Sequence, residues 1–237
     1  MHGNEPALVS VLEDASTVGY DAVLVLGDLV GYGADPAAVI ERIFDLKPLA
    51  IVRGNHDKVC AGLEPATLFN DVAKRSIEWT RGVLSSEDLR RLADLPQGPV
   101  TVTDDVEICH GTPFDEDYYV FDVSDAQRAI DAASARICLF GHTHVPAIYA
   151  TADPPKSGRQ HLSTDETELP ASGRVIINVG SVGQPRDGDP RAAYGVLDLD
   201  RNVIRMRRVA YDIASAQARI HRADLPASLA ARLERGQ

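Results

Sequence analysis

Five of the seven histidines share one kind of position in the sequence. Each lies at a predicted strand end, beside glycine or another small residue: His2, His56, His110, His142 and His144. Glycine lets the backbone turn sharply and lets a ligand approach, so such a histidine presents its imidazole at the edge of a cleft. A single histidine of this kind is usually an ordinary surface or core residue. Five of them together indicate a site.

Oxygen-bearing side chains occupy matching positions. Asp28 ends the first predicted strand, and Asn55 and Asp57 flank His56. Each alone is explained by the preference of Asp and Asn for turns. Together with the histidines they supply imidazole, carboxylate and amide ligands, a set that suits Mn, Fe, Zn or Ni better than Ca or Mg.

The first half of the chain predicts the elements that bring these residues together. Asn4 is predicted to cap a helix that ends near Gly19, and Pro36 to start a second helix. The apolar runs "DAVLVLGD" (21–28) and "LAIVRGNHD" (49–57) are typical of buried strands. This β-α-β order places functional groups at the carboxyl ends of strands, where open α/β sheets bind ligands.

The second half is rich in predicted strands, and we interpret residues 1–237 as one domain. One or two helices are expected over 66–95, with Ser85 or Ser86 as a cap, and another over 124–135. The polar stretch 151–173 is interpreted as a surface excursion or irregular hairpin. The predicted strands are "GPVTVT", "VEICHG", "RICLFGH", "RVIINVGS", "AAYGVLDL" and "NVIRMRRVAY".

Charge and composition narrow the function. The chain has 24 basic and 35 acidic residues, a net charge of −11 that opposes binding of long nucleic acid. A small phosphate ester remains suitable as substrate if bound metal ions make the local electrostatic potential positive. No apolar run approaches the roughly 20 residues of a membrane span and no signal peptide is evident, so we expect a cytoplasmic protein without a membrane partner. Cys60, Cys109 and Cys138 are expected to be buried free thiols, and the oligomeric state is left open.

Six motifs in order resemble those of the calcineurin-like metallophosphoesterases, particularly the small prokaryotic phosphodiesterase branch. They are "HGN", "GDLVGYG", "GNHD", "HG", "GHTH" and "NVGSVGQPRDGDPRAAY", and the resemblance runs from residue 2 to about residue 198. It implies an α/β fold, a four-layer αββα sandwich with two mixed β-sheets. It also implies two divalent transition-metal ions about 3.5–4 Å apart. Mn, Fe, Ni and Zn all suit the ligands, and Mn is favoured.

The resemblance implies a role for each motif residue. Asp28 would bridge the two metals. The remaining metal ligands would be Asn55, His110 and His142 for one ion, and His2 and His144 for the other. His56 would protonate the leaving oxygen, oriented by a hydrogen bond that its imidazole donates to the Asp57 carboxylate. Arg53 and Arg186 would hold the substrate phosphate.

One family residue has no counterpart. The family pattern is Asp-x-His-Gly-Asn after an apolar strand, and here x is Met1. We therefore expect a domain truncated at its N-terminal strand, with weaker binding of one metal, and hypothesise that the true start lies upstream.

The expected activity is metal-dependent hydrolysis of a phosphodiester by a hydroxide that the two ions activate. Two alternatives stay open at this point. One is a non-catalytic or degenerate binding scaffold, favoured by the absent aspartate but opposed by the presence of His56. The other is a serine/threonine-type protein phosphatase, which would be expected to carry additional arginines in its motifs.

Overall fold

Helices and strands alternate through the first half of the chain, and strands dominate the second. The computed structural model describes residues 1–151 and 166–237. The helices are α1 (Glu5–Val18), α2 (Pro36–Asp45), α3 (Asn55–Ala61), the short 3-10 helix η1 (Ala66–Leu68), α4 (Asp71–Val83), α5 (Ser86–Ala93), α6 (Val123–Ala132), α7 (Ile213–Arg222) and α8 (Ala227–Leu233). The strands are β1 (Leu24–Val25), β2 (Ala50–Ile51), β3 (Val100–Thr101), β4 (Val106–Ile108), β5 (Ile137–Phe140), β6 (Ala147–Ala150), β7 (Glu166–Glu168), β8 (Val175–Asn178), β9 (Ala192–Asp198) and β10 (Val203–Val209).

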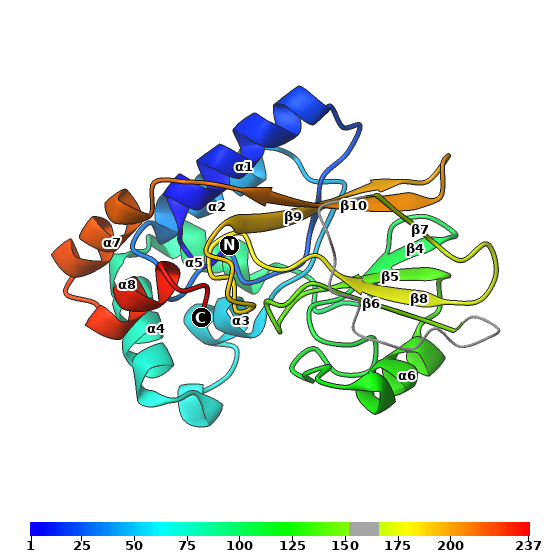
Figure 1. Cartoon of the computed structure of the whole chain (residues 1–237). Helices are drawn as coiled ribbons and strands as arrows, with labels where there is room; N and C mark the ends of the chain where they lie inside the picture. Colours follow the sequence, from blue (N-terminus) through cyan, green and yellow to red (C-terminus); the bar gives the residue numbers. More distant parts are fainter. Residues whose placement is uncertain (152–165) are drawn as a thin grey trace.

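The strands form a sandwich covered by helices on both faces, as the predicted αββα fold requires. A five-stranded sheet has the order β3-β4-β5-β8-β6, and a three-stranded antiparallel sheet has the order β7-β10-β9. Helix α1 lies over β9 and β10, whereas α6 lies on the outer face of the five-stranded sheet (Figure 1). Ile108 and Ile177 of one sheet share a buried core with Ile204 of the other.

The second of the two expected mixed β-sheets is not continuous: among the described residues its strands form two separate sheets. Strands β1 and β2 form a separate parallel pair, with Leu24 opposite Ala50. Both are shorter than the apolar runs predicted. Strand β1 ends at Val25 and is followed by a turn at Gly27, whose φ is 85°, while β2 ends at Ile51 and α3 begins directly after Gly54. Both strands therefore stop early and become loops that carry candidate site residues.

Several predicted element boundaries are confirmed. The Asn4 side chain accepts a hydrogen bond from the Ala7 amide and caps α1, and α2 begins at Pro36. The six strand-like runs of the second half appear as β3, β4, β5, β8, β9 and β10, and the helix expected over 124–135 is α6. The three cysteines are buried and free.

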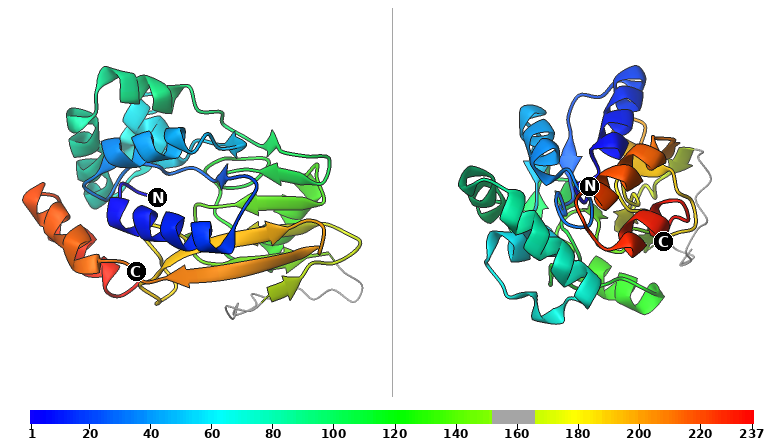
Figure 2. Two further views of the ribbon diagram at one scale, coloured as in Figure 1. Left: turned by 90° about the horizontal axis from the view of Figure 1, so that it is seen from above. Right: turned by 90° about the vertical axis from the view of Figure 1, so that its left-hand side faces the viewer.

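Other parts of the fold were not predicted. Strand β6 and the C-terminal helices α7 and α8 had no expected counterpart. Of the predicted excursion 151–173, residues 152–165 lie outside the described residues, and β7 pairs with β10 through Ile204 opposite Thr167. Both chain ends lie on the side of the molecule that α7 and α8 occupy (Figures 1 and 2). Across the described ranges, every helix is too short or too polar to cross a bilayer.

The cap of α5 gives a test of this packing. The Ser85 hydroxyl accepts a hydrogen bond from the Asp88 amide, and the Asp88 carboxylate accepts one from the Ser85 amide. Helix α5 packs against α3, so its N-terminus supports the segment that follows Asn55. We expect Ser85→Ala to lower the free energy of unfolding by about 1 kcal/mol in urea denaturation. Ser86→Ala, one residue into the helix, is the control and should change it by much less.

Candidate metal centre

The candidate site forms where several strands end together. Strands β4, β5 and β8 are parallel neighbours, and β1 is parallel to β2. Their carboxyl ends therefore meet at one edge, where the chain continues into the loops and the helix that carry polar residues. These loops and the turn before α1 bring together residues far apart in the sequence: His2, Asp28, Asn55, His110, His142 and His144.

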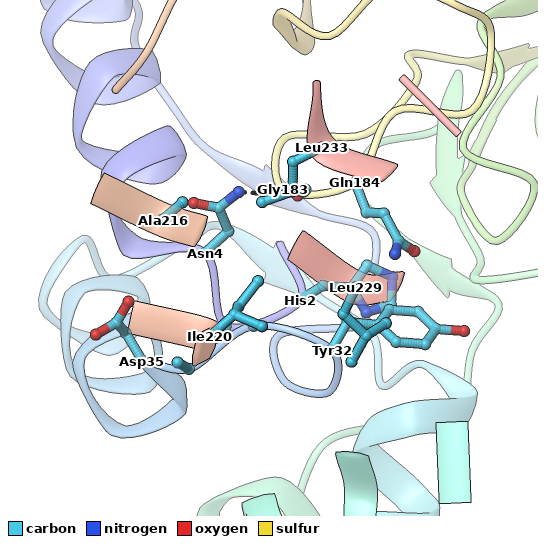
Figure 3. Close-up of a pocket in the computed structure, with 13 residues that line it drawn as sticks. His2, Asn4, Tyr32, Asp35, Gly183, Gln184, Ala216, Ile220, Leu229 and Leu233 are labelled. Atoms are coloured by element: carbon cyan, nitrogen blue, oxygen red, sulfur yellow. Dashed lines mark hydrogen bonds between the residues drawn. The ribbon is translucent and has the colours of Figure 1, made fainter. Parts of the chain in front are cut away.

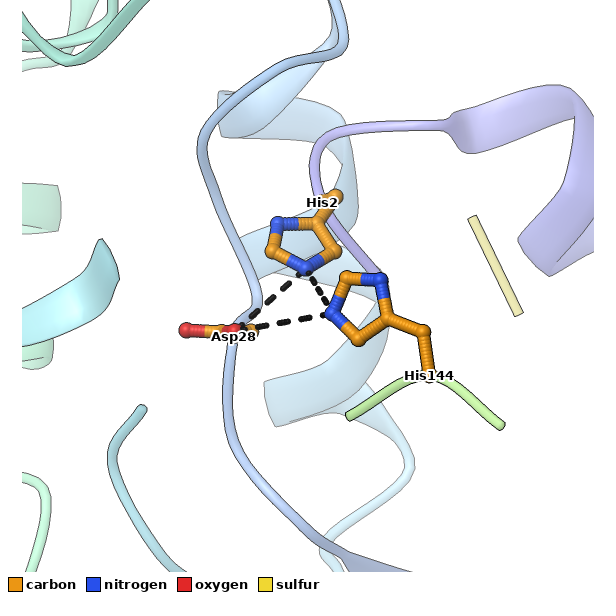
Figure 4. Close-up of side chains that lie close together, drawn as sticks. All are labelled: His2, Asp28 and His144. Atoms are coloured by element: carbon orange, nitrogen blue, oxygen red, sulfur yellow. Dashed lines mark hydrogen bonds and ion pairs between the residues drawn. The ribbon is translucent and has the colours of Figure 1, made fainter. Parts of the chain in front are cut away.

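Two groups of side chains at this edge can each hold a metal ion. One consists of His2, Asp28 and His144, and the other of Asp28, His110 and His142. Within each group the donor atoms lie within 4.8 Å of one another, and every member is buried. Figure 4 shows the imidazoles of the first group turned toward the Asp28 carboxylate. Asp28 belongs to both groups, as expected of a bridging ligand.

The hydrogen bonds of the first group fix which nitrogens can bind a metal. His2 Nδ1 lies 3.2 Å from the Val30 carbonyl oxygen, and His144 Nδ1 lies 2.8 Å from that of Gln184. A carbonyl oxygen only accepts hydrogen bonds, so both Nδ1 atoms carry the proton. The two Nε2 atoms then present lone pairs to each other at 2.8 Å. This arrangement is repulsive unless a cation lies between them, so the donor set fits a metal ion.

The second group follows the same rule with one ring reversed. His110 Nδ1 lies 2.7 Å from the Leu26 carbonyl oxygen, and His142 Nε2 lies 3.0 Å from that of Asp117. His110 Nε2 and His142 Nδ1 therefore face each other at 3.1 Å, and these are the two nitrogens that can bind a metal. The Asn55 amide oxygen lies 3.3 Å from His110 Nε2, which adds an oxygen donor to this group.

The protonation states suit the same role. Burial lowers the pKa of His2 and His142 well below the ordinary value and that of His144 to about 3, so these imidazoles are neutral at pH 7. Burial also lowers the pKa of His110, but the charge of Asp28 and its hydrogen bond outweigh this, and the net pKa is raised. Burial acts to raise the pKa of Asp28, yet the neighbouring His110 and His2 hold it well below its usual range. Asp28 is therefore ionised.

The backbone at the site is strained. His2, Asp28, His142 and His144 have φ values of 55°, 52°, 63° and 61°, in the left-handed region that non-glycine residues rarely adopt. Such residues persist where surrounding structure holds them, and they cluster at functional sites. The backbone amide of His2 donates to the carbonyl of Asp28 at 2.8 Å, and that of Gly3 donates to Leu29 at 2.8 Å.

Two polar side chains, Asn178 and Ser181, support the ligand loops. The Asn178 amide nitrogen donates to the Gly141 carbonyl at 2.5 Å and lies 3.0 Å from the Thr143 hydroxyl. The Ser181 hydroxyl accepts from the Gln184 amide at 3.0 Å, and the carbonyl of Gln184 holds His144. Strand β8 therefore fixes the loop that presents His142 and His144.

The predicted hydrogen bond between Asp57 and His56 is wrong. The Asp57 carboxylate is fully buried and accepts the backbone amides of Leu29 at 2.8 Å, Val30 at 3.2 Å and Gly54 at 2.9 Å. These donors satisfy the carboxylate, so Asp57 joins the loop after Asp28 to the start of α3. Among the described residues, His56 Nδ1 has no hydrogen-bond partner and packs against Gly31.

His56 itself lies beside the metal-ligand candidates. Its ring centroid is 4.9 Å from that of His2 and 4.4 Å from that of Tyr32. Its backbone amide donates to Asp28 Oδ1 at 3.0 Å. Burial lowers the pKa of His56 to about 4, so the imidazole is neutral in the ligand-free protein.

The two arginines expected to bind phosphate differ in their surroundings. Arg53 donates to both carboxylate oxygens of Glu116 at 2.9 Å, and Lys58 also reaches Glu116 at 3.2 Å. The Nε–Nη2 edge of the Arg53 guanidinium is thus engaged by Glu116. The expected substrate-binding role of Arg53 stays a prediction. Arg186 lies 3.1 Å from the Gln184 amide oxygen and 3.4 Å from the Tyr32 hydroxyl, and is half-buried.

Some contributors could not have been found from sequence. The carbonyl groups of Leu26, Val30, Asp117 and Gln184 set the histidine tautomers, and a backbone carbonyl has no residue-type signature. Glu116 carried no signal either, because it is an ordinary acidic residue 63 positions from Arg53. The ring of Tyr32 contacts His2 and His56 and joins a cluster with α7 and α8.

Comparisons with known proteins agree with this geometry. The family model for the calcineurin-like phosphoesterase superfamily domain matches residues 1–202. An uncharacterised protein of Methanocaldococcus jannaschii is 33% identical over 242 residues, which span 100% of this chain and 96% of the relative. The crystal structure of a metallophosphoesterase from Sphaerobacter thermophilus has a TM-score of 0.88 and 37% identity, covering 100% of this chain and 96% of the other. A hypothetical protein from Pyrococcus horikoshii shares the fold, with a TM-score of 0.79 and 21% identity over 100% and 95% of the two chains.

The buried contacts of Asp57 give the second prediction. Asp57→Asn replaces one acceptor oxygen by an NH₂ group that faces backbone N–H donors, so at least one buried donor loses its partner. We expect the free energy of unfolding to fall by about 1–3 kcal/mol in urea denaturation. Asp71→Asn, at an exposed position in the first turn of α4, is the control and should have less effect. Unchanged stability of Asp57→Asn would contradict the structural role assigned to this carboxylate.

The shared carboxylate gives the third prediction. Because Asp28 belongs to both groups, we expect Asp28→Asn to weaken the binding of both ions. His110→Asn should abolish the binding of one ion and leave the other bound. Bound manganese per chain would be measured by plasma mass spectrometry after equilibration with Mn²⁺ and removal of free metal. His221→Ala changes an exposed histidine on α7 and should retain the wild-type content. Equal loss in the Asp28 and His110 variants would contradict a two-ion arrangement bridged by Asp28.

Proposed function

The chain belongs to the calcineurin-like phosphoesterase superfamily, and from this premise we propose that it is a phosphodiesterase that works with two divalent metal ions. Membership supports a metal-dependent phosphoesterase in general terms. The observation that carries the proposal is the convergence of four imidazole nitrogens on the ionised carboxylate of Asp28. The other nitrogen of each ring is held by a backbone carbonyl, so these four are the ones that can bind a cation.

We assign the ions to the two groups that share Asp28. His2 and His144 complete one site, and Asn55, His110 and His142 complete the other. Mn, Fe, Ni and Zn suit these ligands, and Mn is our preferred ion. When bound, the pair supplies Lewis-acid activation of a water molecule and of the phosphoryl group. The protein supplies positions and tautomers, because each ring is held by a backbone carbonyl on its far side.

His56 is the proposed proton donor to the leaving oxygen. It lies beside the ligand groups, and its Nδ1 atom is not engaged by any described residue. The same imidazole is neutral in the ligand-free protein, because burial lowers its pKa to about 4. An anionic phosphate that binds against the ring favours the protonated form, so the substrate itself would raise this pKa toward the working range.

Arg186 is the arginine we propose for substrate binding. It is half-buried, and its side chain hydrogen-bonds the neutral groups of Tyr32, Tyr119 and Gln184. It is close enough to His144 and His56 that its charge helps to lower the pKa of each. A guanidinium without a carboxylate partner at the edge of such a site suits an anionic substrate.

Two observations bear on the alternative functions. Arg53 is held by Glu116, which leaves fewer free arginines than a protein phosphatase of the serine/threonine type would be expected to use. His56 and both metal-ligand groups are in place, which argues against a degenerate scaffold. The net charge of −11 continues to argue against long nucleic acid, so we propose a small phosphodiester as substrate.

The fourth prediction tests the role of His56. We expect His56→Ala to keep the wild-type manganese content but to lose roughly 10²–10⁴-fold in kcat on a diester with an alkoxide leaving group. The loss should be much smaller on bis(p-nitrophenyl) phosphate, because p-nitrophenolate departs without needing a proton. Rates would be measured with Mn²⁺ at saturating concentration.

The comparison of the two substrates separates the possible outcomes. An equal loss on both diesters would contradict proton donation by His56 while leaving the phosphodiesterase proposal intact. Absence of any manganese-dependent turnover in the folded, metal-loaded wild-type protein would refute the proposed activity and favour a binding scaffold. His221→Ala serves again as the control histidine and should retain activity on both substrates.

A further inference from the structure

A second positively charged feature lies beside the metal centre. The guanidinium carbon of Arg186 is 5.8 Å from the centroid of the Tyr32 ring, and that of Arg232 is also 5.8 Å from it. Arg186 comes from the loop after β8, whereas Arg232 comes from the last turn of α8. Residues far apart in the sequence thus place two cations against one aromatic ring.

The Tyr32 ring connects these cations to the candidate site. Its centroid lies 4.8 Å from the ring of His2 and 4.4 Å from that of His56. Figure 3 shows Tyr32 beside His2 and Leu229, where α8 covers the turn that carries His2. Leu229 and Leu233 are buried in the cluster that Tyr32 joins, so α8 is held firmly beside the ring.

The charge of the pair is not balanced by a carboxylate. Within residues 1–151 and 166–237, neither Arg186 nor Arg232 forms an ion pair, although most other arginines of this acidic protein do. Both arginines are half-buried. Burial and the nearby charge of Arg186 lower the pKa of Arg232, and the only recorded influence that raises it is that of Tyr32. Two like charges held together without a counter-ion are typical of an anion-binding site.

We propose that Arg186 and Arg232 form an anion subsite that holds a second phosphate group of the substrate, next to the phosphodiester at the metal centre. The inference rests on the proposed function and extends it to a substrate class: phosphodiesters that carry a terminal phosphate monoester. Helix α8, which carries Arg232, lies beyond residues 1–202, the part of the chain that the family model covers.

Charge and position both favour a second phosphate over the scissile one. A phosphodiester carries one negative charge, whereas a phosphate monoester carries nearly two at neutral pH, which matches two guanidinium groups. The Tyr32 ring contacts His2 and His56, and both cations lie against that ring. A ligand that reaches both places must extend past the aromatic ring, so the two anionic groups belong to one longer molecule.

The fifth prediction uses two substrates that differ by one phosphate. They are thymidine 5′-(p-nitrophenyl phosphate) and the same ester with a 3′-phosphate. For the manganese-loaded wild-type protein we expect the 3′-phosphate to lower KM about tenfold, because it would form charge-assisted contacts with two half-buried arginines. Arg232→Gln and Arg186→Gln should each remove most of this advantage, and Arg232→Gln should leave the KM of the unphosphorylated ester nearly unchanged.

Controls separate the subsite from a structural effect. Arg235→Gln changes an exposed arginine three positions beyond Arg232 and should keep the full advantage. Equal KM values for the two esters in the wild type would overturn the subsite, as would an Arg232→Gln variant that weakens both esters by the same factor.

A binding measurement distinguishes failure of the subsite from failure of the proposed function. If neither ester is hydrolysed, the proposed activity fails, and calorimetric titration of the metal-loaded protein with thymidine 3′,5′-bisphosphate and thymidine 5′-monophosphate decides the subsite alone. Tighter binding of the bisphosphate that is lost in Arg232→Gln supports it. Equal affinity for the two nucleotides refutes it.

Discussion

The whole arrangement depends on one buried carboxylate. Asp28 Oδ2 lies 3.3 Å from both His2 Nε2 and His110 Nε2, in a site with almost no access to water. An ionised group in such surroundings is costly unless cations or hydrogen-bond donors compensate it. Metal cations at the convergence point would satisfy the carboxylate and the imidazole lone pairs together. The electrostatics of this donor set and the metal chemistry of the superfamily therefore lead to the same conclusion.

The fold maintains this arrangement against its own strain. Four residues of the site hold left-handed backbone conformations, each of which costs roughly 1–2 kcal/mol in a non-glycine residue. The neighbouring strands are buried, with Ile108 and Ile177 fully inaccessible in the core between the sheets. The Asp57 carboxylate and the Asn178 amide then join separate loops through backbone hydrogen bonds. Core packing supplies the stability, and the hydrogen bonds of Asp57 and Asn178 hold the loops in position.

Local patterns predicted the parts of the structure that local physics determines. The cap at Asn4, the helix start at Pro36 and the six strand-like runs of the second half follow from propensity and periodicity. The ordered motifs also identified the residues that meet at the sheet edge. The hydrogen-bond partners of Asp57 and Arg53 were not predicted, because the motifs do not contain them: backbone amides after Asp28 in one case and Glu116 in the other. The docking of α8 on Tyr32 is likewise a long-range contact with no local signature.

The histidines of the site differ in their hydrogen bonds, and the difference matches their proposed roles. His2, His110, His142 and His144 each give one N–H to a backbone carbonyl, which fixes the tautomer and leaves a lone pair for a cation. The Nδ1 atom of His56 has no such partner among the described residues. A bond to a carbonyl fixes which nitrogen carries the proton and directs the other nitrogen at a cation, whereas neither orientation nor tautomer of His56 is fixed in this way at Nδ1. The backbone thus fixes the histidines that must stay constant and leaves free the one whose proposed role requires change.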